Sequence, residues 1–496
     1  MILRNARPVP LGTLGPDGDG AVSTEPVDVR LDHVGAPDEV VDADGAWVIP
    51  GLWDQHVHLA QWSLAGGRFD LAGVTSVGEV VERLEARMAQ FPGAPVIGWG
   101  HRPSGWSQAP TTADLDAVSE HIPIVLIAGD AHHGWLNSAA LGALGLLWRE
   151  GVVSEDEWFA TYARLGDAFG SEEPTAQGYR SAMEAAAAIG VTGLVDFEFS
   201  VGPAQWLDLW EGGADLLRIR TATYADGLEA VINRDLRTGQ TIGGHRRLTM
   251  GALKIISDGS LNTATAWCCE PYAPGAVLPF GEPNQTPEEL ADLLTRAHAY
   301  GLEAAVHAIG DRAVEVALDV FAATGARGSI EHAQLVRPDD VRRIAELGLR
   351  ASVQPAHLLD DRDPIEHLWP GRSERCFPLR WMLDAGVDLA LGSDAPVSPL
   401  DPWLAMAAAV HRSADERDSW HPEQSLTARE ALAASVDGAP TFGSENNGDF
   451  VLLDADPLAG GGSGSEAAAH LLTMKDRVLA TYVDGVEVWA RPGSPG

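Results

Sequence analysis

The sequence predicts an α/β protein, a (β/α)8 TIM-like barrel joined to a small composite β-sandwich. Three observations predict this fold class. Helical stretches alternate with short apolar runs over most of the chain, which is typical of a parallel sheet. Eight of these apolar runs have the spacing of barrel strands. Strand-like runs separated by Gly, Pro and Asp turns recur at both ends of the chain, outside the alternating region.

Glycines mark the boundaries of the alternating elements. Helical stretches after residue 175 stop at a glycine, the usual cap just past a helix end: Gly190, Gly301, Gly348 and Gly386. One stretch opens with residues 286–289, Thr-Pro-Glu-Glu, a capping box with proline at the first helical position. The apolar run after each glycine is the next predicted strand. The eight predicted strands end near His58, Phe197, Thr223, Ser257, His307, His332, Gln354 and Asp394.

Residues from about 60 to 175 form an insert after the first predicted barrel strand. This segment is too long for one barrel connection and contains strand-like runs of its own, such as 124–128. We expect a subdomain over the mouth of the barrel. The predicted barrel spans residues 51–439, and the two chain ends, 1–50 and 440–496, are predicted to pair into the β-sandwich.

The composition disfavours several classes of partner. The net charge of −37 would repel nucleic acids and anionic membranes. No apolar run is long enough to span a bilayer, and the first residues lack the apolar stretch of a signal peptide. The three cysteines offer no disulfide framework. We therefore expect a cytoplasmic protein that acts on a small molecule, with no nucleic-acid and no membrane partner. A homo-oligomer is compatible with the sequence.

The most informative chemical signal is the pair His56 and His58 at the end of the first predicted barrel strand. Residues two apart on a strand face the same side, so both imidazoles point to one place, as two ligands of one metal need. Such pairs also occur by chance in proteins. The weight of the signal therefore depends on residues farther along the chain.

Four more residues of metal-ligand type stand at other predicted strand ends: Lys254, His307, His332 and Asp394. Each alone has a structural explanation, such as a core histidine or an aspartate in a turn. The sequence holds only two lysines, and Lys254 lies among apolar neighbours, where an unpaired lysine is rarely buried. Because active sites of (β/α)8 barrels form at the C-terminal ends of the strands, we expect these residues to converge.

The predicted set supports hydrolytic chemistry. Three or more His and Asp ligands with an open position make a catalytic zinc site, and two metal ions can share a nucleophilic hydroxide. A buried lysine near two cations is pushed towards its neutral form, and a neutral amine can take up carbon dioxide as a carbamate that bridges both ions. Asp394 could bind one ion and pass a proton from the hydroxide to the leaving nitrogen.

These motifs resemble those of the amidohydrolase superfamily, and in particular its YtcJ-like branch, which includes N-substituted formamide deformylase. The resemblance covers nearly the whole chain and keeps the order of the segments. The matching segments read PGLWDQHVH (50–58), DAHHGWLNS (130–138), KIISDGSL (254–261), HAIGDRA (307–313), IEHAQ (330–334), QPAH (354–357), LGSDAPV (391–397) and GDFVLLD (448–454).

The resemblance implies a hydrolase of amide or other non-peptide C–N bonds, with a divalent metal centre that is usually zinc. The implied ligands are His56, His58, Lys254, His307, His332 and Asp394. The first two histidines and the aspartate would hold one ion, the other two histidines a second ion, and carboxylated Lys254 would bridge the two.

Four residues are candidates for substrate contacts: His132, Asp311, Arg312 and Gln354. His132 belongs to the insert motif of the branch, with a structural or lid role as the alternative. Asp311 and Arg312 follow a ligand strand, and their alternative is an ion pair at the start of a helix. His101 and His357 are weaker candidates.

Two other hypotheses stay open at this level. One is a mononuclear deaminase of the same superfamily, which would not need Lys254. The other is a non-catalytic binding protein stabilised by a structural metal. A structural site is normally closed, whereas this ligand set leaves room for water.

Overall fold

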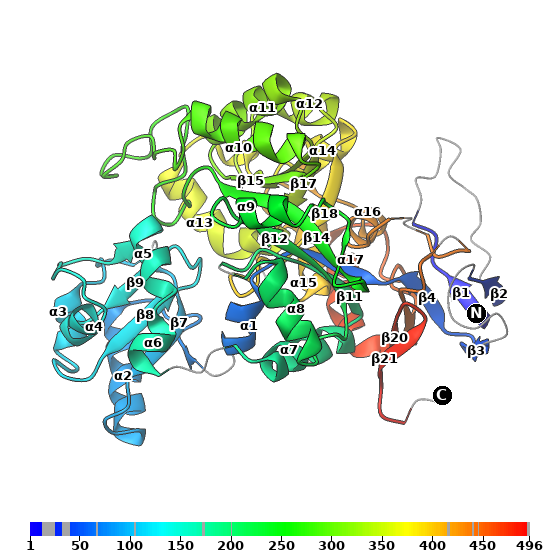
Figure 1. The fold of residues 1–496 in the computed structure, drawn as a ribbon, viewed down its shortest axis with the longest axis horizontal. Helices are drawn as coiled ribbons and strands as arrows, with labels where there is room; N and C mark the ends of the chain where they lie inside the picture. Colours follow the sequence, from blue (N-terminus) through cyan, green and yellow to red (C-terminus); the bar gives the residue numbers. More distant parts are fainter. Residues whose placement is uncertain are drawn as a thin grey trace.

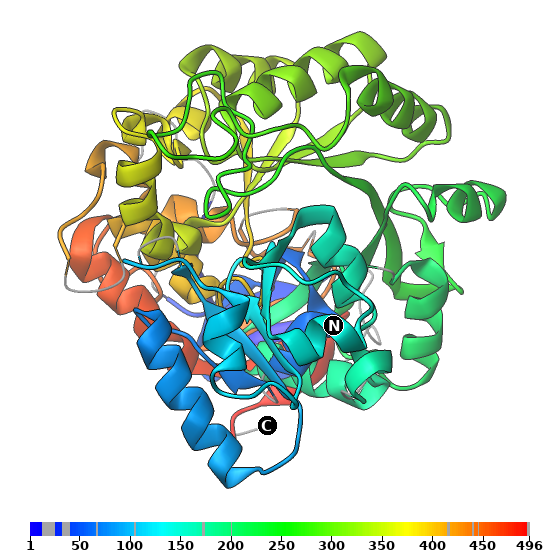
Figure 2. The ribbon, with the colours of Figure 1, turned by 90° about the vertical axis from the view of Figure 1, so that its left-hand side faces the viewer.

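The computed structural model describes residues 1–11, 25–31, 40–65, 68–103, 106–170, 174–199, 201–413, 417–438, 441–444 and 446–493. It has three parts: a barrel, an insert and a sheet made from the two chain ends. Figure 1 places the insert and the terminal sheet at opposite ends of the barrel. Figure 2, turned by 90°, shows the insert in front of the lower part of the barrel.

Eight parallel strands form the barrel: β5 (Leu52–Val57), β11 (Val191–Asp196), β12 (Arg218–Thr223), β14 (His245–Ile256), β15 (Ala304–Ala308), β16 (Gly328–His332), β17 (Arg350–Val353) and β18 (Asp388–Leu391). Their spatial order follows the chain order, and the short β13 (Thr241–Ile242) pairs antiparallel with β14. The last strand reaches the first through Asp394, whose N–H donates to the His56 carbonyl at 2.7 Å. The predicted barrel and its eight strands are confirmed.

The strand register brings the predicted ligands to one level. In the pairing of β14 with β15, Ile256 lies opposite His307. In the pairing of β15 with β16, Ala308 lies opposite His332. Because parallel strands in this register end together, residues scattered along the sequence reach the same mouth of the barrel.

Helices surround the strands: α7 (Ala176–Ala188), α8 (Pro203–Glu211), α9 (Leu228–Asn233), α10 (Pro287–Ala299), α11 (Asp311–Thr324), α12 (Pro338–Glu346), α14 (Leu379–Asp384) and α15 (Pro402–His411). The predicted capping box is present, because Thr286 and Glu289 each accept the other's backbone N–H, at 3.2 and 2.8 Å. Gly301 and Gly386, just past helix ends, adopt φ of 74° and 81°, a region that favours glycine. These helix boundaries therefore follow from local sequence.

The insert is a five-stranded sheet of its own. Its strands in spatial order are β10 (Val153–Ser154), β9 (His133–Leu136), β8 (Ile124–Ala128), β7 (Val96–His101) and β6 (Phe69–Asp70). Its helices are α2 (Val77–Gln90), α3 (Thr112–Asp116), α4 (Ser138–Ala143), α5 (Glu155–Tyr162) and α6 (Leu165–Phe169). Helix α1 (Leu59–Ala65) leads from the first barrel strand into this unit. The insert expected from segment length is therefore present.

The two ends of the chain share one sheet: β1 (Ile2–Pro8), β2 (Val27–Arg30), β3 (Val40–Asp42), β4 (Trp47–Pro50), β19 (Phe450–Leu453), β20 (Val478–Val483) and β21 (Val486–Ala490). The link between the ends is the antiparallel pairing of β4 with β19. Remaining helices are α13 (Leu358–Leu368), α16 (Ala428–Ala433) and α17 (Gly464–Thr473). The predicted pairing of the two chain ends is confirmed, and together they form one seven-stranded sheet.

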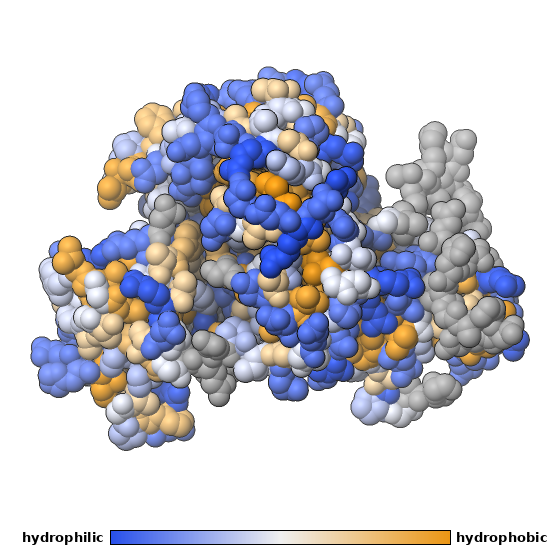
Figure 3. Space-filling model, viewed as in Figure 1, coloured by the Kyte–Doolittle hydropathy of each residue, from blue (hydrophilic) through white to orange (hydrophobic). Residues whose placement is uncertain are grey.

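Apolar side chains fill the space between barrel strands and helices, among them the fully buried Leu194, Ile219 and Ile330. Burying one such side chain contributes roughly 1.5–3 kcal/mol. Figure 3 shows hydrophilic residues over much of one face, interrupted by smaller hydrophobic groups. Within the described parts of the chain, no helix combines the length and apolar composition needed to cross a bilayer.

A buried ion pair fastens the terminal sheet to the barrel. Arg218 on β12 donates to both carboxylate oxygens of Asp449, at 2.5 and 3.0 Å, and Asp449 is 4% exposed. We expect Asp449→Ala to lower the free energy of unfolding by about 3 kcal/mol, because it leaves the partly buried guanidinium with only its longer contact to Asp484, at 3.4 Å. Denaturant unfolding followed by circular dichroism measures this loss. The matched control is Asp388→Ala, since the Asp388–Arg350 pair is exposed and contributes about 1 kcal/mol or less. Equal losses in both variants would contradict the prediction.

Candidate metal centre

The predicted ligands converge at the C-terminal mouth of the barrel. Ligand atoms of His56, His332 and Asp394 all lie within 4.8 Å of one another. His58 Nε2 lies 3.3 Å from Asp394 Oδ1. The ring centroid of His307 lies 4.5 Å from that of His332. Lys254 Nζ lies 3.4 Å from His56 Nε2, so all the predicted ligands meet in one place.

Two small adjoining cavities occupy this mouth, with volumes of about 40 and 30 Å³. The residues that line both are Asp130, His132, His307, His332, Asp394 and Val397. Spaces of this size hold a few atoms of the size of water or a metal ion. The larger part of any organic substrate therefore has to lie outside them.

The backbone turns two of the ligands inward. His332 and Asp394 adopt φ of 68° and 57°, in the left-handed region that residues other than glycine rarely occupy. Such conformations cost free energy and recur at functional sites, where the surrounding structure imposes them. Here Asp54 is one such constraint, because its Oδ1 accepts the N–H of Ser393 at 2.8 Å and of His56 at 3.2 Å.

Glu331 orients His56 from below. Its Oε2 lies 2.7 Å from His56 Nδ1, which leaves Nε2 facing Lys254 and Asp394. Metal-binding histidines usually engage a carboxylate through their second nitrogen in this way. Glu331 directly precedes His332 in the matching motif, but its role could not be predicted from the sequence because its partner lies 275 residues away.

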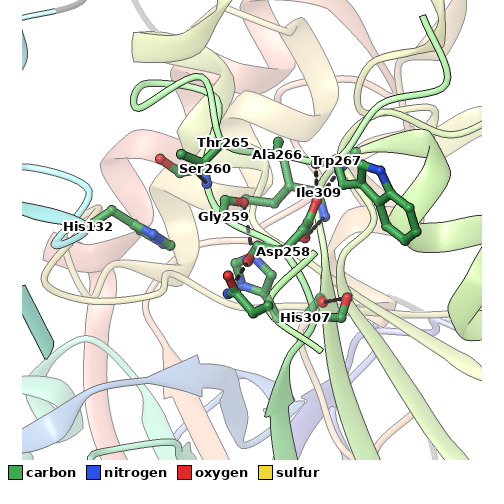
Figure 4. A network of polar contacts seen from close by, with 12 residues as sticks. His132, Asp258, Gly259, Ser260, Thr265, Ala266, Trp267, His307 and Ile309 are labelled. Carbon is green, nitrogen blue, oxygen red and sulfur yellow. Dashed lines mark hydrogen bonds and ion pairs between the residues drawn. The ribbon is translucent and has the colours of Figure 1, made fainter. Parts of the chain in front are cut away.

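Asp258 ties the loop after β14 to the loop after β15, as Figure 4 shows. Its Oδ1 accepts the N–H of Ile309 at 3.0 Å, and its Oδ2 accepts those of Gly310 and Trp267, both at 2.9 Å. Asp258 Oδ1 also lies 3.5 Å from His307 Nε2. The carboxylate therefore holds His307 in position, and it too was missed by sequence reasoning.

The electrostatics of the site suit metal ligands. Burial, followed by the positive charge of Lys254, holds the pKa of His56 and of His307 well below 6.5. These imidazoles are neutral at pH 7 and can offer a lone pair. Burial alone would raise the pKa of Asp394, but the hydrogen bond and charge of His58 outweigh it, so the carboxylate is ionised.

Burial lowers the pKa of Lys254 from 10.5 to about 8, although Glu331 and Asp394 oppose the shift. Its Nζ lies 4.5 Å from the centre of the Phe197 ring. A pKa near 8 makes the neutral amine accessible at pH 7, to roughly one part in ten. The neutral amine is the form of lysine that can react with carbon dioxide.

Unpartnered polar atoms support the fit of a metal ion. His332 Nδ1 is buried and, within the described parts of the chain, has no hydrogen-bond partner, and Asp394 Oδ1 faces only imidazole nitrogens of His58 and His56, at 3.3 and 3.5 Å. Leaving such atoms unsatisfied is costly. A cation between them would satisfy both, so the donor set fits a divalent ion.

The insert contributes His132 to the cavity wall. His132 Nδ1 lies 3.0 Å from Glu155 Oε2, and Glu155 Oε1 accepts from Thr265 of the barrel at 2.8 Å. Figure 4 shows His132 pointing towards the His307 network, and the two rings lie 5.9 Å apart. Burial alone would lower the pKa of His132, but Glu155 outweighs it and raises the pKa to about 9. His132 is therefore a cation facing the site.

The structure does not bring the other three predicted substrate contacts to the cavities. Asp311 accepts from Arg375 Nη1 at 3.2 Å, at the start of α11. Arg312 pairs with Glu315 near the protein surface, so both residues form ion pairs at the start of a helix, the kind of role given as their alternative. Gln354 is buried and donates to the Ser352 carbonyl at 3.4 Å.

Of the weaker candidates, His357 lines the smaller cavity, with Nε2 3.8 Å from Asp394 Oδ2. His101 lies in the insert and contacts the Ile127 carbonyl at 3.1 Å. It does not line either cavity. Of these three residues, only His357 therefore lines a cavity at the mouth of the barrel.

Comparison with known proteins agrees with this geometry. The Amidohydrolase family matches residues 39–488. The chain is 28% identical to the protein LONG AFTER FAR-RED 3 of Arabidopsis thaliana, over 90% of this chain and 83% of that one. It is 26% identical to the N-substituted formamide deformylase of Arthrobacter pascens, over 96% and 94% of the two chains. A crystal structure of an uncharacterized metal-dependent hydrolase from Pyrococcus horikoshii superimposes with a TM-score of 0.72 and 25% identity, covering 92% and 98%.

Proposed function

This chain belongs to the amidohydrolase family and is a metal-dependent hydrolase, and we propose that it cleaves small non-peptide amides, N-substituted formamides among them. The observation that carries the proposal is the meeting of His56, His332 and Asp394 at the barrel mouth, with ligand atoms within 4.8 Å of one another. Three such ligands around an open cavity are the arrangement of a catalytic rather than a structural metal.

We propose two divalent ions, with zinc as the native metal. His56, His58 and Asp394 would hold one ion, and His307 and His332 the other. Lys254, as a carbamate, would bridge them, which its short distance to His56 and its lowered pKa support. Bound ions of this kind lower the pKa of a water molecule and polarise a carbonyl group.

Residues of the protein carry out the proton transfers. Asp394, ionised and buried, accepts the proton of the attacking water and delivers it to the leaving nitrogen as the C–N bond breaks. Protonated His132 faces the same cavity and donates a hydrogen bond to the carbonyl oxygen of the substrate, where negative charge develops. Glu331 and Asp258 hold His56 and His307 in place.

The metal content of the purified protein, by elemental mass spectrometry, tests the site. We expect about two zinc-like ions per chain, and loss of amide hydrolysis on chelation that added zinc restores. About one ion would favour a mononuclear site, as the deaminase alternative requires, and remove the bridging role of Lys254. No metal, and no amide hydrolysis on adding zinc, would contradict the proposed function.

The protonation of His132 should be visible in the pH profile. Because its pKa is about 9, we expect kcat/KM to fall as the pH rises through about 9, when His132 loses its proton. We expect His132→Gln to lower kcat/KM by about a hundredfold at pH 7. The variant should also lack the alkaline fall, since glutamine does not titrate. A variant that keeps both the rate and the fall would show that His132 does not contact the reacting group.

A further inference from the structure

A much larger cleft, of about 710 Å³, lies beside the metal cavities. The barrel helices α1, α7 and α8 form one side, and α5 and α6 of the insert form the other. Small-molecule sites commonly have this volume. This cleft shares two wall residues with the larger metal cavity, Phe159 and Phe199. The cleft and the cavity are therefore neighbours separated by an aromatic pair.

The aromatic pair touches the catalytic machinery on its other side. The rings of Phe159 and Phe199 stack with centroids 5.3 Å apart and planes inclined by 25°. Phe199 also stacks on the predicted metal ligand His58, at 5.2 Å and 18°. Phe159 meets His132 edge-on at 5.6 Å. A substrate that extends past these two rings would reach from the cleft to the predicted metal site.

The cleft is lined mainly by apolar and aromatic side chains. These include Leu64, Tyr162, Leu165, Val201 and Leu209. Its charged wall residues are Arg68, Asp167, Glu198 and Asp208. Three carboxylates against one guanidinium disfavour a ligand that carries its own carboxylate. The guanidinium donates to the Tyr162 hydroxyl at 2.7 Å through Nη2, while its buried Nη1 has no hydrogen-bond partner among the described residues. The apolar walls, rather than the guanidinium, therefore favour an uncharged apolar group.

We propose that this cleft binds the non-reacting substituent of the amide substrate, an uncharged aliphatic or aromatic group of medium size. The metal cavity, at about 40 Å³, has room for the reacting carbonyl and little more. The substituent therefore needs the neighbouring space, and Phe159 and Phe199 set which shapes reach it. This assignment rests on the proposed amide hydrolysis.

Filling the cleft tests the assignment. Leu209 lies half-buried on α8 and lines the cleft, away from the metal ligands. We expect the wild type to hydrolyse N-hexylformamide with a kcat/KM at least about tenfold above that of N-methylformamide, because the hexyl group is buried in the cleft. The carboxylate analogue, 6-formamidohexanoate, should lose most of this advantage.

Leu209→Trp should lower kcat/KM for N-hexylformamide about tenfold relative to that for N-methylformamide, because the larger side chain fills the cleft. The matched control is Leu147→Trp, the same change at a residue of the insert that is 84% exposed, and it should alter neither substrate. Phe159→Leu, which removes one ring of the pair, should raise the rate for branched substituents. Equal losses on both formamides in Leu209→Trp, with the control unchanged, would overturn the assignment.

A binding measurement separates the two proposals. Calorimetry with N-hexylformamide on the metal-loaded Asp394→Asn protein, in which turnover is expected to be very slow, reports occupancy of the cleft. If no amide is hydrolysed, the proposed function fails, whereas binding that Leu209→Trp abolishes and Leu147→Trp preserves would still support the cleft. Turnover of N-methylformamide without any preference for the hexyl group would contradict the assignment of the cleft but would still support the proposed function.

Discussion

Asp394→Asn is expected to lower kcat/KM for amide hydrolysis by about a thousandfold or more, the upper range for loss of general acid–base catalysis. Asparagine keeps the shape of the buried side chain but neither accepts a proton nor carries the charge that faces His56 and His58. The distances of 3.5 and 3.3 Å from Asp394 Oδ1 to these histidines show how little freedom a substitute has. Steady-state kinetics, with the metal content and melting temperature of the variant, measure the effect.

A second buried aspartate provides the matched control. Asp311 is fully buried, as Asp394 nearly is, but it pairs with Arg375 and does not line the cavities. We expect Asp311→Asn to lower the melting temperature while its folded fraction keeps kcat within a few-fold of wild type. Asp394→Asn with full metal content and more than a tenth of wild-type activity would contradict the proton-transfer role. A thousandfold loss of kcat in Asp311→Asn would instead support Asp311 as a substrate contact.

Lys254→Ala is expected to abolish the second metal ion and to lower activity by about a thousandfold, because the two ions lose their shared ligand and its charge. Lys254 Nζ lies 3.4 Å from His56 Nε2, so its removal leaves a gap beside the ligands. Short carboxylates such as formate or acetate fit such a gap and offer two oxygens. They should restore part of the activity and of the metal content of the variant.

The chain offers a direct control for this prediction, since it has one other lysine. Lys475 pairs with Asp401 at 3.2 Å and is partly exposed, so Lys475→Ala should leave metal content and activity unchanged. Carbon-13 NMR after incubation with labelled bicarbonate should show one carbamate resonance in wild type and Lys475→Ala. A Lys254→Ala variant that keeps two ions without added carboxylate would refute the bridging role.

Local sequence was sufficient to predict where the helices begin and end. Glycines with positive φ end the helices before β15 and β18, and the capping box at residues 286–289 starts α10 where predicted. These signals act over a few residues, so one sequence contains them completely. The ligand-type residues at the strand ends could be placed together because the strands of a parallel barrel share one C-terminal mouth. That rule depends on the fold class and needs no knowledge of contacts.

Contacts between distant segments could not be predicted from the sequence. Glu331 holds His56 across 275 residues, and Glu155 of the insert holds His132 beside the barrel loop of Thr265. In the sequence alone, nothing distinguishes these two glutamates from other acidic residues in strands or helices. The opposite error has the same origin: Asp311 follows a ligand strand and looks functional, yet its carboxylate is used by Arg375.

The sequence by itself therefore determined the barrel, the ends of its strands, the insert, and most of the residues that stand at the mouth. Only the tertiary structure decided which of those residues share a cavity, which carboxylates orient them, and that a large apolar cleft lies behind Phe159 and Phe199. Periodicity and caps are properties of neighbouring residues. The protonation of a buried histidine and the space beside it depend on side chains that meet only after the chain has folded.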